Sequence, residues 1–283
     1  MQNSEFLNCQ YGMYFNTYTV GSNNLSTISG STFKWENLFK KPSVKPENHI
    51  HLFKTSAVTI TASNFLQETP AVYGGIDQYG KGIYSNNSEF KIYSGCTNIF
   101  LPIGQDCAES NTVRSQFKNL VYGVYVVNSN SKPFVVLRNE FTNCSYGVYS
   151  IMAKNQTVSR NKFHVAESTG QTCGLYVYRG TGYKIEENIF QEFDNPLIAN
   201  GSGNSYGLII YDSDTLHNEV YKNTFSKLKI GAQAQGINGR KVGQNNDGTT
   251  GLQFICNEFK SPIYLTDIGV NGRIDKEQGE SGA

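Results

Sequence analysis

The chain lacks the features that identify nucleic-acid-binding and membrane-spanning proteins. Only 17% of its 283 residues are charged, and 24 basic residues offset 23 acidic ones to a net charge of +1. Neutralising the phosphates of a nucleic acid needs an excess of Lys and Arg, so no nucleic-acid partner is expected. A membrane helix needs about 20 consecutive apolar residues. The longest apolar run, Val121 to Val127, contains a glycine, and membrane insertion is not expected either.

Metal-ligand spacing is missing as well. The six cysteines form no C-x-x-C pair and stand beside no histidine, and His49 and His51 have no third ligand near them. The sequence therefore predicts no metal site and no cofactor. Cys96 and Cys107 bracket an irregular segment. In an oxidising compartment they could form a disulfide, and elsewhere they would remain thiols.

Glycine and aromatic residues are abundant, with 28 Gly, 18 Tyr and 17 Phe. Together with frequent Asn and Thr, this composition favours short strands joined by tight turns over long helices. An all-β fold is expected.

One short pattern recurs along the chain: an apolar residue, two variable residues, Asn or Ser, one variable residue, and Phe. It is clearest where it ends at Phe141, Phe163, Phe190, Phe225 and Phe259, and weaker copies end at Phe6, Phe33, Phe65, Phe90 and Phe117. The ten copies recur every 28 residues or so on average, about the period of solenoid repeats. Tyr-Gly-Val-Tyr or a related sequence follows several copies, as at Tyr122–Tyr125 and Tyr146–Tyr149.

Such a unit cannot bury its apolar face alone, whereas a stack of units can. Alternation along the motif turns the Phe and the apolar residue five positions before it inward. The Asn or Ser is expected at a bend, where Asn tolerates the left-handed conformation and its amide can bond to the amide one coil away.

The motif V/I-x-x-N-x-F followed by Y-G-V-Y resembles the short repeat of pectate-lyase-like proteins. The resemblance covers nearly the whole chain and implies a single-stranded right-handed parallel β-helix of about ten coils, its handedness included. We expect this repeat domain over residues 1–275 and a flexible tail over 276–283. Because neither end shows a cap, the chain is interpreted as a segment of a longer, secreted or cell-surface protein, with its export signal outside the segment.

Catalytic candidates are few. The Gly-His-Gly of polygalacturonases and the Asp-Pro-His of mannuronan epimerases, two enzyme families of this resemblance, are missing. Asp212 and Asp214 would project from one side of a strand, and stacking would bring Arg179 beside Asp212. An acid pair with an arginine can serve acid–base chemistry, while the plainer interpretation is a solvated turn with one ion pair.

Extra residues fall in the same part of several repeats, and two of these insertions belong to neighbouring coils. They bring His164, Glu167, Glu192 and Asp194 into one region, either as the rim of a cleft or as tolerated surface excursions.

A binding surface is the other possibility. Tyr125, Tyr149 and Tyr176 occupy equivalent outward positions in three consecutive coils, where flat rings could stack on sugars or simply protect the strands. Arg138 and Arg160 repeat at the position three residues before Phe, either balanced by nearby acids such as Glu140 or forming a stripe for an anionic polysaccharide.

These observations favour a non-catalytic or carbohydrate-binding β-helix module outside the cell, with a polysaccharide or glycan as its partner. The alternative is a polysaccharide lyase or glycoside hydrolase that acts on an acidic polysaccharide, with Asp212, Asp214, Arg179, Glu192 and Asp194 as its catalytic candidates. Ca²⁺ is considered as a cofactor only under the lyase alternative.

Overall fold

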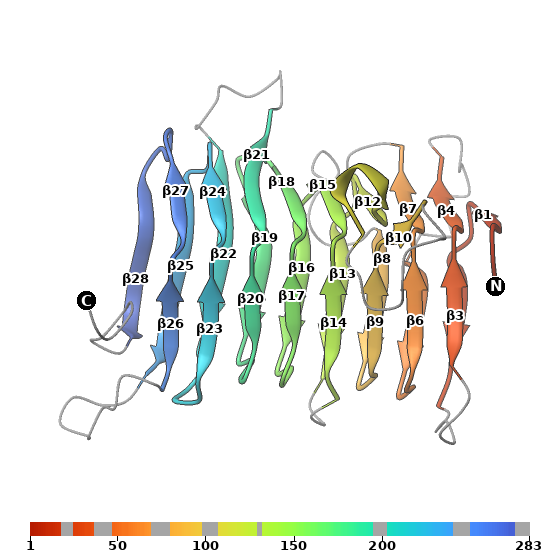
Figure 1. The fold of residues 1–283 in the computed structure, drawn as a ribbon, viewed down its shortest axis with the longest axis horizontal. Helices are drawn as coiled ribbons and strands as arrows, with labels where there is room; N and C mark the ends of the chain where they lie inside the picture. Colours follow the sequence, from red (N-terminus) through yellow and green to blue (C-terminus); the bar gives the residue numbers. More distant parts are fainter. Residues whose placement is uncertain are drawn as a thin grey trace.

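The protein is a parallel β-helix built from three long parallel sheets (Figure 1). The computed structural model describes residues 1–17, 25–36, 47–68, 80–97, 107–128, 132–194, 203–239 and 250–274. The predicted all-β solenoid is confirmed. The predicted tail over 276–283 lies outside the described residues.

Each complete coil contributes one strand to each sheet, and the last described coil contributes to sheets 2 and 3. Sheet 1 contains, in stacking order, β3 (Ser26–Ser29), β6 (Val58–Thr61), β9 (Phe90–Tyr93), β14 (Phe134–Leu137), β17 (Thr157–Ser159), β20 (Lys184–Glu186), β23 (Asn218–Tyr221) and β26 (Leu252–Ile255). Sheet 2 contains β1 (Glu5–Leu7), β4 (Thr32–Trp35), β7 (Asn64–Gln67), β12 (Gln116–Lys118), β15 (Glu140–Cys144), β18 (Lys162–Ala166), β21 (Ile189–Phe193), β24 (Thr224–Ser226) and β27 (Glu258–Lys260).

Sheet 3 contains β2 (Tyr11–Phe15), β5 (Asn48–Phe53), β8 (Lys81–Asn86), β13 (Tyr122–Val127), β16 (Tyr146–Ile151), β19 (Gln171–Tyr178), β22 (Asn204–Tyr211), β25 (Ile230–Asn238) and β28 (Thr266–Ile274). Between β9 and β12 the chain leaves the coil stack. There β10 (Gly95–Cys96) and β11 (Thr112–Val113) pair antiparallel, and the short 3₁₀ helix η2 (Glu109–Asn111) precedes β11.

The motif phenylalanines form a continuous column inside sheet 2. Neighbouring rings lie 4.6–5.2 Å apart and within 12° of parallel, through Phe6, Phe33, Phe65, Phe117, Phe141, Phe163, Phe190, Phe225 and Phe259. Burying such a ring stabilises a fold by about 1.5–3 kcal/mol. The predicted inward direction of Phe141 and of Val136 is confirmed, since both are buried.

Phe90 does not belong to this column. It lies in β9 of sheet 1, where its ring stacks on Phe134 at 5.3 Å. The segment before Phe90 is the turn from sheet 3 to sheet 1, so its resemblance to the motif is incidental. The described residues therefore form nine strands in sheet 2, and the coil of Phe117 lies directly on that of Phe65.

The asparagines of the motif form a buried ladder inside the corner between sheets 1 and 2. Nδ2 of Asn161 donates to Oδ1 of Asn188 at 3.0 Å, and Nδ2 of Asn188 donates to Oδ1 of Asn223 at 2.9 Å. The left-handed conformation expected at Asn instead falls on the residue before it, as at Arg138 with φ 56° and Arg160 with φ 55°. The backbone turns one residue earlier, and this orients the Asn amide along the stack.

The glycine after the first Tyr of Tyr-Gly-Val-Tyr is explained by the phenylalanine column. A Cβ on Gly147 would lie 2.6 Å from the ring of Phe163 and 2.5 Å from the carbonyl oxygen of Gly174. Only glycine leaves room for the ring of the next coil.

Among the described residues there is also no helix with the length and apolarity that a membrane span requires.

Candidate functional site

The outward face of sheet 3 carries a column of tyrosines, one in each of four consecutive coils. In strand register Tyr84 pairs with Tyr125, Tyr125 with Tyr149, and Tyr149 with Tyr176. We call these four residues the tyrosine ladder. The residues on either side of Tyr149, Val148 and Ser150, are fully buried, so the pleat turns the ladder tyrosines outward. The structure thus brings together the three tyrosines that the sequence predicts in one row.

The ladder rings face one another and do not lie flat on the sheet. The Tyr149 and Tyr176 centroids are 4.7 Å apart at 14°, and those of Tyr84 and Tyr125 are 5.5 Å apart at 20°. Tyr125 and Tyr149 lie 5.4 Å apart at 43°. Strands repeat at about 4.8 Å, which is close to the stacking distance of two rings. The ladder therefore presents ring edges and hydroxyl groups to solvent, where the sequence suggested open ring faces.

Three of the ladder hydroxyls, those of Tyr125, Tyr149 and Tyr176, remain protonated at neutral pH. Burial raises the pKa of Tyr176 to about 12 and raises the pKa values of Tyr125 and Tyr149 above their usual range. A second row widens this surface, because Tyr146 meets Tyr149 edge to face at 5.2 Å and Tyr122 meets the same ring at 5.5 Å. Each neutral phenol can both donate and accept a hydrogen bond.

The aromatic column continues past Tyr84 towards the first coil. His51 lies 4.8 Å from Tyr84 and 4.4 Å from Tyr14. Among the described residues neither ring nitrogen of His51 has a hydrogen-bond partner. Burial lowers the pKa of His51, and Glu47 opposes this effect.

Lys81 and Glu47 add charge at this end of the ladder, and the sequence reasoning missed both. The amine of Lys81 lies 6.0 Å from the centroid of the Tyr84 ring, and its pKa is lowered by burial. Glu47 accepts a hydrogen bond from Gln10 at 2.9 Å. The register offered a signal for Lys81, because it occupies the strand position that Tyr122 holds in the next coil.

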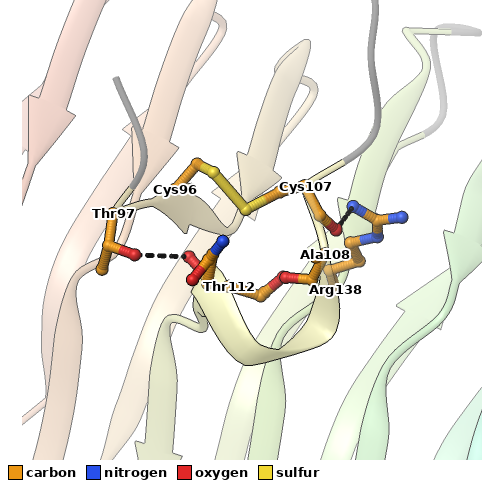
Figure 2. Close-up of a disulfide and its surroundings, with 7 residues drawn as sticks. Cys96, Thr97, Cys107, Ala108, Thr112 and Arg138 are labelled. Carbon is orange, nitrogen blue, oxygen red and sulfur yellow. Dashed lines mark hydrogen bonds between the residues drawn. A yellow bond between two sulfur atoms is a disulfide. The ribbon is translucent and has the colours of Figure 1, made fainter. Parts of the chain in front are cut away.

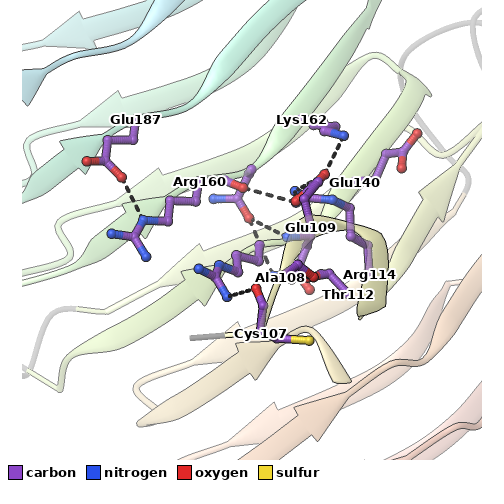
Figure 3. Close-up of polar contacts among 12 residues, drawn as sticks. Cys107, Ala108, Glu109, Thr112, Arg114, Glu140, Arg160, Lys162 and Glu187 are labelled. Atoms are coloured by element: carbon purple, nitrogen blue, oxygen red, sulfur yellow. Dashed lines mark hydrogen bonds and ion pairs between the residues drawn. The ribbon is translucent and has the colours of Figure 1, made fainter. Parts of the chain in front are cut away.

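Arg138 and Arg160 lie at a different corner of the coil from the tyrosine ladder. Both stand between a strand of sheet 1 and a strand of sheet 2. Nη1 of Arg138 donates to the carbonyl oxygen of Cys107 at 3.2 Å (Figure 2), and Nε of Arg160 donates to Glu187 at 2.6 Å (Figure 3). The structure therefore does not join these arginines to the tyrosines in one surface.

The carboxylates that face this arginine corner differ from the one suggested by the sequence. Nη2 of Arg114 donates to both carboxylate oxygens of Glu109, at 2.8 and 2.7 Å (Figure 3). Glu140 instead pairs with His164 at 3.4 Å, and His164 lowers the pKa of Glu140 to about 2. Glu109 comes from outside the repeat, so the repeat spacing could not place it.

The disulfide considered from the sequence is present. Cys96 in β10 is bonded to Cys107, which lies two residues before η2 (Figure 2). Beside it, the backbone N–H of Thr97 donates to the carbonyl oxygen of Asn111 at 2.9 Å. The disulfide and the β10–β11 pairing together hold η2 beside Arg114 and Arg138.

Asp212, Asp214 and Arg179 line a shallow groove of about 340 Å³, together with Thr181 and Ile237. Nε of Arg179 lies 3.8 Å from Oδ2 of Asp212. Oδ1 of Asp212 accepts the backbone N–H of Ile237 at 2.9 Å. The structure thus brings the three predicted residues together. One carboxylate oxygen of Asp212, however, is already hydrogen-bonded to the backbone.

The acids expected on a common rim differ in their exposure to solvent. Glu192 is buried and accepts a hydrogen bond from the hydroxyl of Ser205. Asp194 is exposed and lies 3.6 Å from Nζ of Lys227. Glu167 is buried as well. Of these acids, only Asp194 stands on the surface.

Comparison with known proteins connects the chain to one family. A family model described as "Periplasmic copper-binding protein (NosD)" matches residues 53–248, more than half of the chain. This is a family of right-handed parallel β-helices, in agreement with the three parallel sheets. A search of curated proteins finds no match. The description corrects one expectation: a copper-binding family contradicts the prediction of no cofactor.

The soft metal donors of this chain do not fit copper as a group. All four His, three Met and six Cys lie in the described ranges, and those ranges contain no cluster of three or more His, Cys, Asp or Glu able to hold a metal ion. Copper favours thiolate, thioether and imidazole ligands. His49 is buried and its ring stacks on Trp35 at 3.6 Å. Burial raises the pKa of the Cys144 thiol to about 12, which disfavours the thiolate form that binds metal. We therefore assign no residue to copper.

Proposed function

The chain belongs to the NosD family, and we propose that it is a non-catalytic β-helix module that binds polysaccharide along the tyrosine ladder. The observation that carries the proposal is the register of Tyr84, Tyr125, Tyr149 and Tyr176 on one outward face. A polysaccharide is itself a periodic chain of hydroxyl groups and apolar ring faces. A row of phenols repeated at about 4.8 Å offers it matching hydrogen bonds and contact area.

The stacking of the rings favours binding. Because Tyr149 is held between Tyr125 and Tyr176, little side-chain freedom remains to be lost when a ligand docks. The ladder runs across the strands, along the axis of the helix. An extended glycan would therefore lie along the axis and contact one tyrosine in each coil.

The polar end of the ladder extends this surface. Lys81 supplies an amine beside Tyr84, and Glu47 supplies a carboxylate that interacts with both Lys81 and His51. Groups of both signs suit the hydroxyl groups of a sugar better than they suit a uniformly charged polymer. The balanced net charge of +1 also favours a glycan over a nucleic acid as the partner.

The groove at Asp212, Asp214 and Arg179 supports the second candidate, a polysaccharide lyase or hydrolase. Asp214 could act there as a base with Arg179 beside it. The bond from Asp212 to the backbone of Ile237 favours a structural role for that carboxylate. We therefore rank catalysis below binding.

A location outside the cytoplasm supports the proposal. The family is described as periplasmic, and disulfides such as Cys96–Cys107 persist in oxidising compartments. Within that range we propose an extracellular or cell-surface position, where polysaccharides are accessible.

A polysaccharide panel tests the function. Binding to immobilised neutral and acidic polysaccharides is measured together with the ultraviolet absorbance of unsaturated sugar released by elimination, with and without Ca²⁺. The proposal expects saturable binding to at least one polysaccharide and no release of sugar. Product formation that is lost in Asp214→Asn would favour the enzyme, and no binding across the panel would reject the module.

A further inference from the structure

The corner between sheets 1 and 2 contains a cluster of cations. Arg114, Arg160 and Lys162 (Figure 3) and Arg138 (Figure 2) come from three successive coils, those of β12, β15 and β18. Arg114 is the most enclosed, with only 10% of its side chain exposed, and its Nη1 donates to the carbonyl oxygen of Arg160 at 3.0 Å. These cations are therefore anchored in the coil stack.

A single carboxylate, Glu109, bridges two of the cations. It accepts Nη2 of Arg114 on both oxygens and Nζ of Lys162 at 2.7 Å on Oε1. Both contacts lower the pKa of Glu109. Arg and Lys converging on one carboxylate is the geometry with which proteins bind carboxylate, sulfate and phosphate ligands.

Glu109 does not belong to the coil stack. It is the first residue of η2 in the disulfide-bonded segment, and 60% of its side chain is exposed. The cations are thus part of the stacked framework, whereas the anion comes from an appended segment and faces solvent.

We propose that Arg114 and Lys162, flanked by Arg138 and Arg160, form an anion-binding site that Glu109 occupies as an internal stand-in for the carboxylate or sulfate group of an acidic polysaccharide. The Cys96–Cys107 disulfide and the hydrogen bond from Arg138 to the carbonyl oxygen of Cys107 hold the segment that carries Glu109 in place. The site is separate from the tyrosine ladder, so it does not rest on the function proposed above.

Removing the charge of Glu109 tests the site. Affinities of the full chain for polygalacturonate, which carries carboxylates, for dextran sulfate and for neutral dextran are measured at low ionic strength in wild type and Glu109→Gln. Glu258→Gln is the matched control, because Glu258 is also 60% exposed and paired with a lysine, Lys260, at 3.2 Å. Circular dichroism verifies that each variant is folded.

We expect Glu109→Gln to bind at least one of the anionic polymers roughly threefold to tenfold tighter than wild type, and Glu258→Gln to match wild type. Adding Lys162→Gln to Glu109→Gln should reverse the gain, and salt should weaken it. The anionic polymer whose affinity rises shows whether the site prefers a carboxylate or a sulfate group. Unchanged affinity of folded Glu109→Gln for both anionic polymers would overturn the proposal, as would an equal gain for neutral dextran.

Discussion

The ring of Tyr149 lies 4.7 Å from the ring of Tyr176 and within 14° of parallel, one coil apart on the outward face of sheet 3. This contact determines what the surface offers to a ligand. Since the Tyr149 and Tyr176 rings cover each other's faces, their hydroxyl groups and ring edges are the parts available for binding.

Removing the ladder hydroxyls while keeping the rings should weaken glycan binding. The variant Tyr125→Phe/Tyr149→Phe/Tyr176→Phe keeps the stacking and loses three hydrogen-bonding groups, each worth about 0.5–1.5 kcal/mol. We expect affinity for the bound polysaccharide to fall roughly tenfold or more, measured by titration calorimetry. Tyr264→Phe, at a tyrosine that is 40% exposed outside the ladder, is the control. Equal affinity of the triple variant and wild type would reject the ladder as the contact.

Filling the space at Gly147 should destabilise the coil stack. In Gly147→Ala the new Cβ would meet the ring of Phe163 at 2.6 Å, a site with no room for it. Overpacking of this kind costs about 1–3 kcal/mol or more, read as a lower midpoint of urea unfolding. Gly269→Ala is matched in chemistry, but its nearest neighbour lies at 3.5 Å. If both variants lost the same stability, the packing explanation of the glycine would fail.

Interrupting the asparagine ladder should have a larger effect than removing a surface asparagine. Asn188→Ala removes the acceptor of the Asn161 backbone N–H and one of the two acceptors of the Asn161 Nδ2 in the buried corner. Each such loss costs about 1–3 kcal/mol. Asn64→Ala, which removes a partly exposed bond to Thr32, should cost less. Denaturant titration of both variants provides the comparison, and equal stabilities would contradict a buried ladder.

Acid should destabilise the protein through His49. Burial lowers the pKa of His49 to about 3, whereas an unfolded histidine titrates near 6.5 or so. Between these values the unfolded chain binds a proton that the folded chain does not, so stability falls as the pH drops. From pH 7 to pH 5 this one group should lower the free energy of unfolding by about 2 kcal/mol.

His49→Phe keeps a ring beside Trp35 and removes this titration. The loss of stability between pH 7 and pH 5, measured by urea unfolding, should therefore be smaller in the variant by about 2 kcal/mol. Parallel curves for the two proteins would show that His49 takes up its proton without unfolding.

The local sequence was sufficient to predict the coil stack. An apolar position, an Asn and a Phe at constant spacing can be satisfied together only if equivalent residues lie above one another, as Phe141 and Phe163 do. The same spacing placed Tyr125, Tyr149 and Tyr176 in one row. It misassigned Phe90 because a short pattern does not reveal which of the three sheets a segment joins.

Only the tertiary structure decided which parts of these side chains are exposed and which groups they contact. Whether a tyrosine shows its face or its edge depends on the coil spacing, and strands about 4.8 Å apart bring rings into stacking range. The partner of Arg114 was equally hidden, since Glu109 reaches it from a segment outside the repeat. Periodicity fixes positions along the axis of a solenoid, but side-chain packing and inserted segments determine which groups meet at its surface.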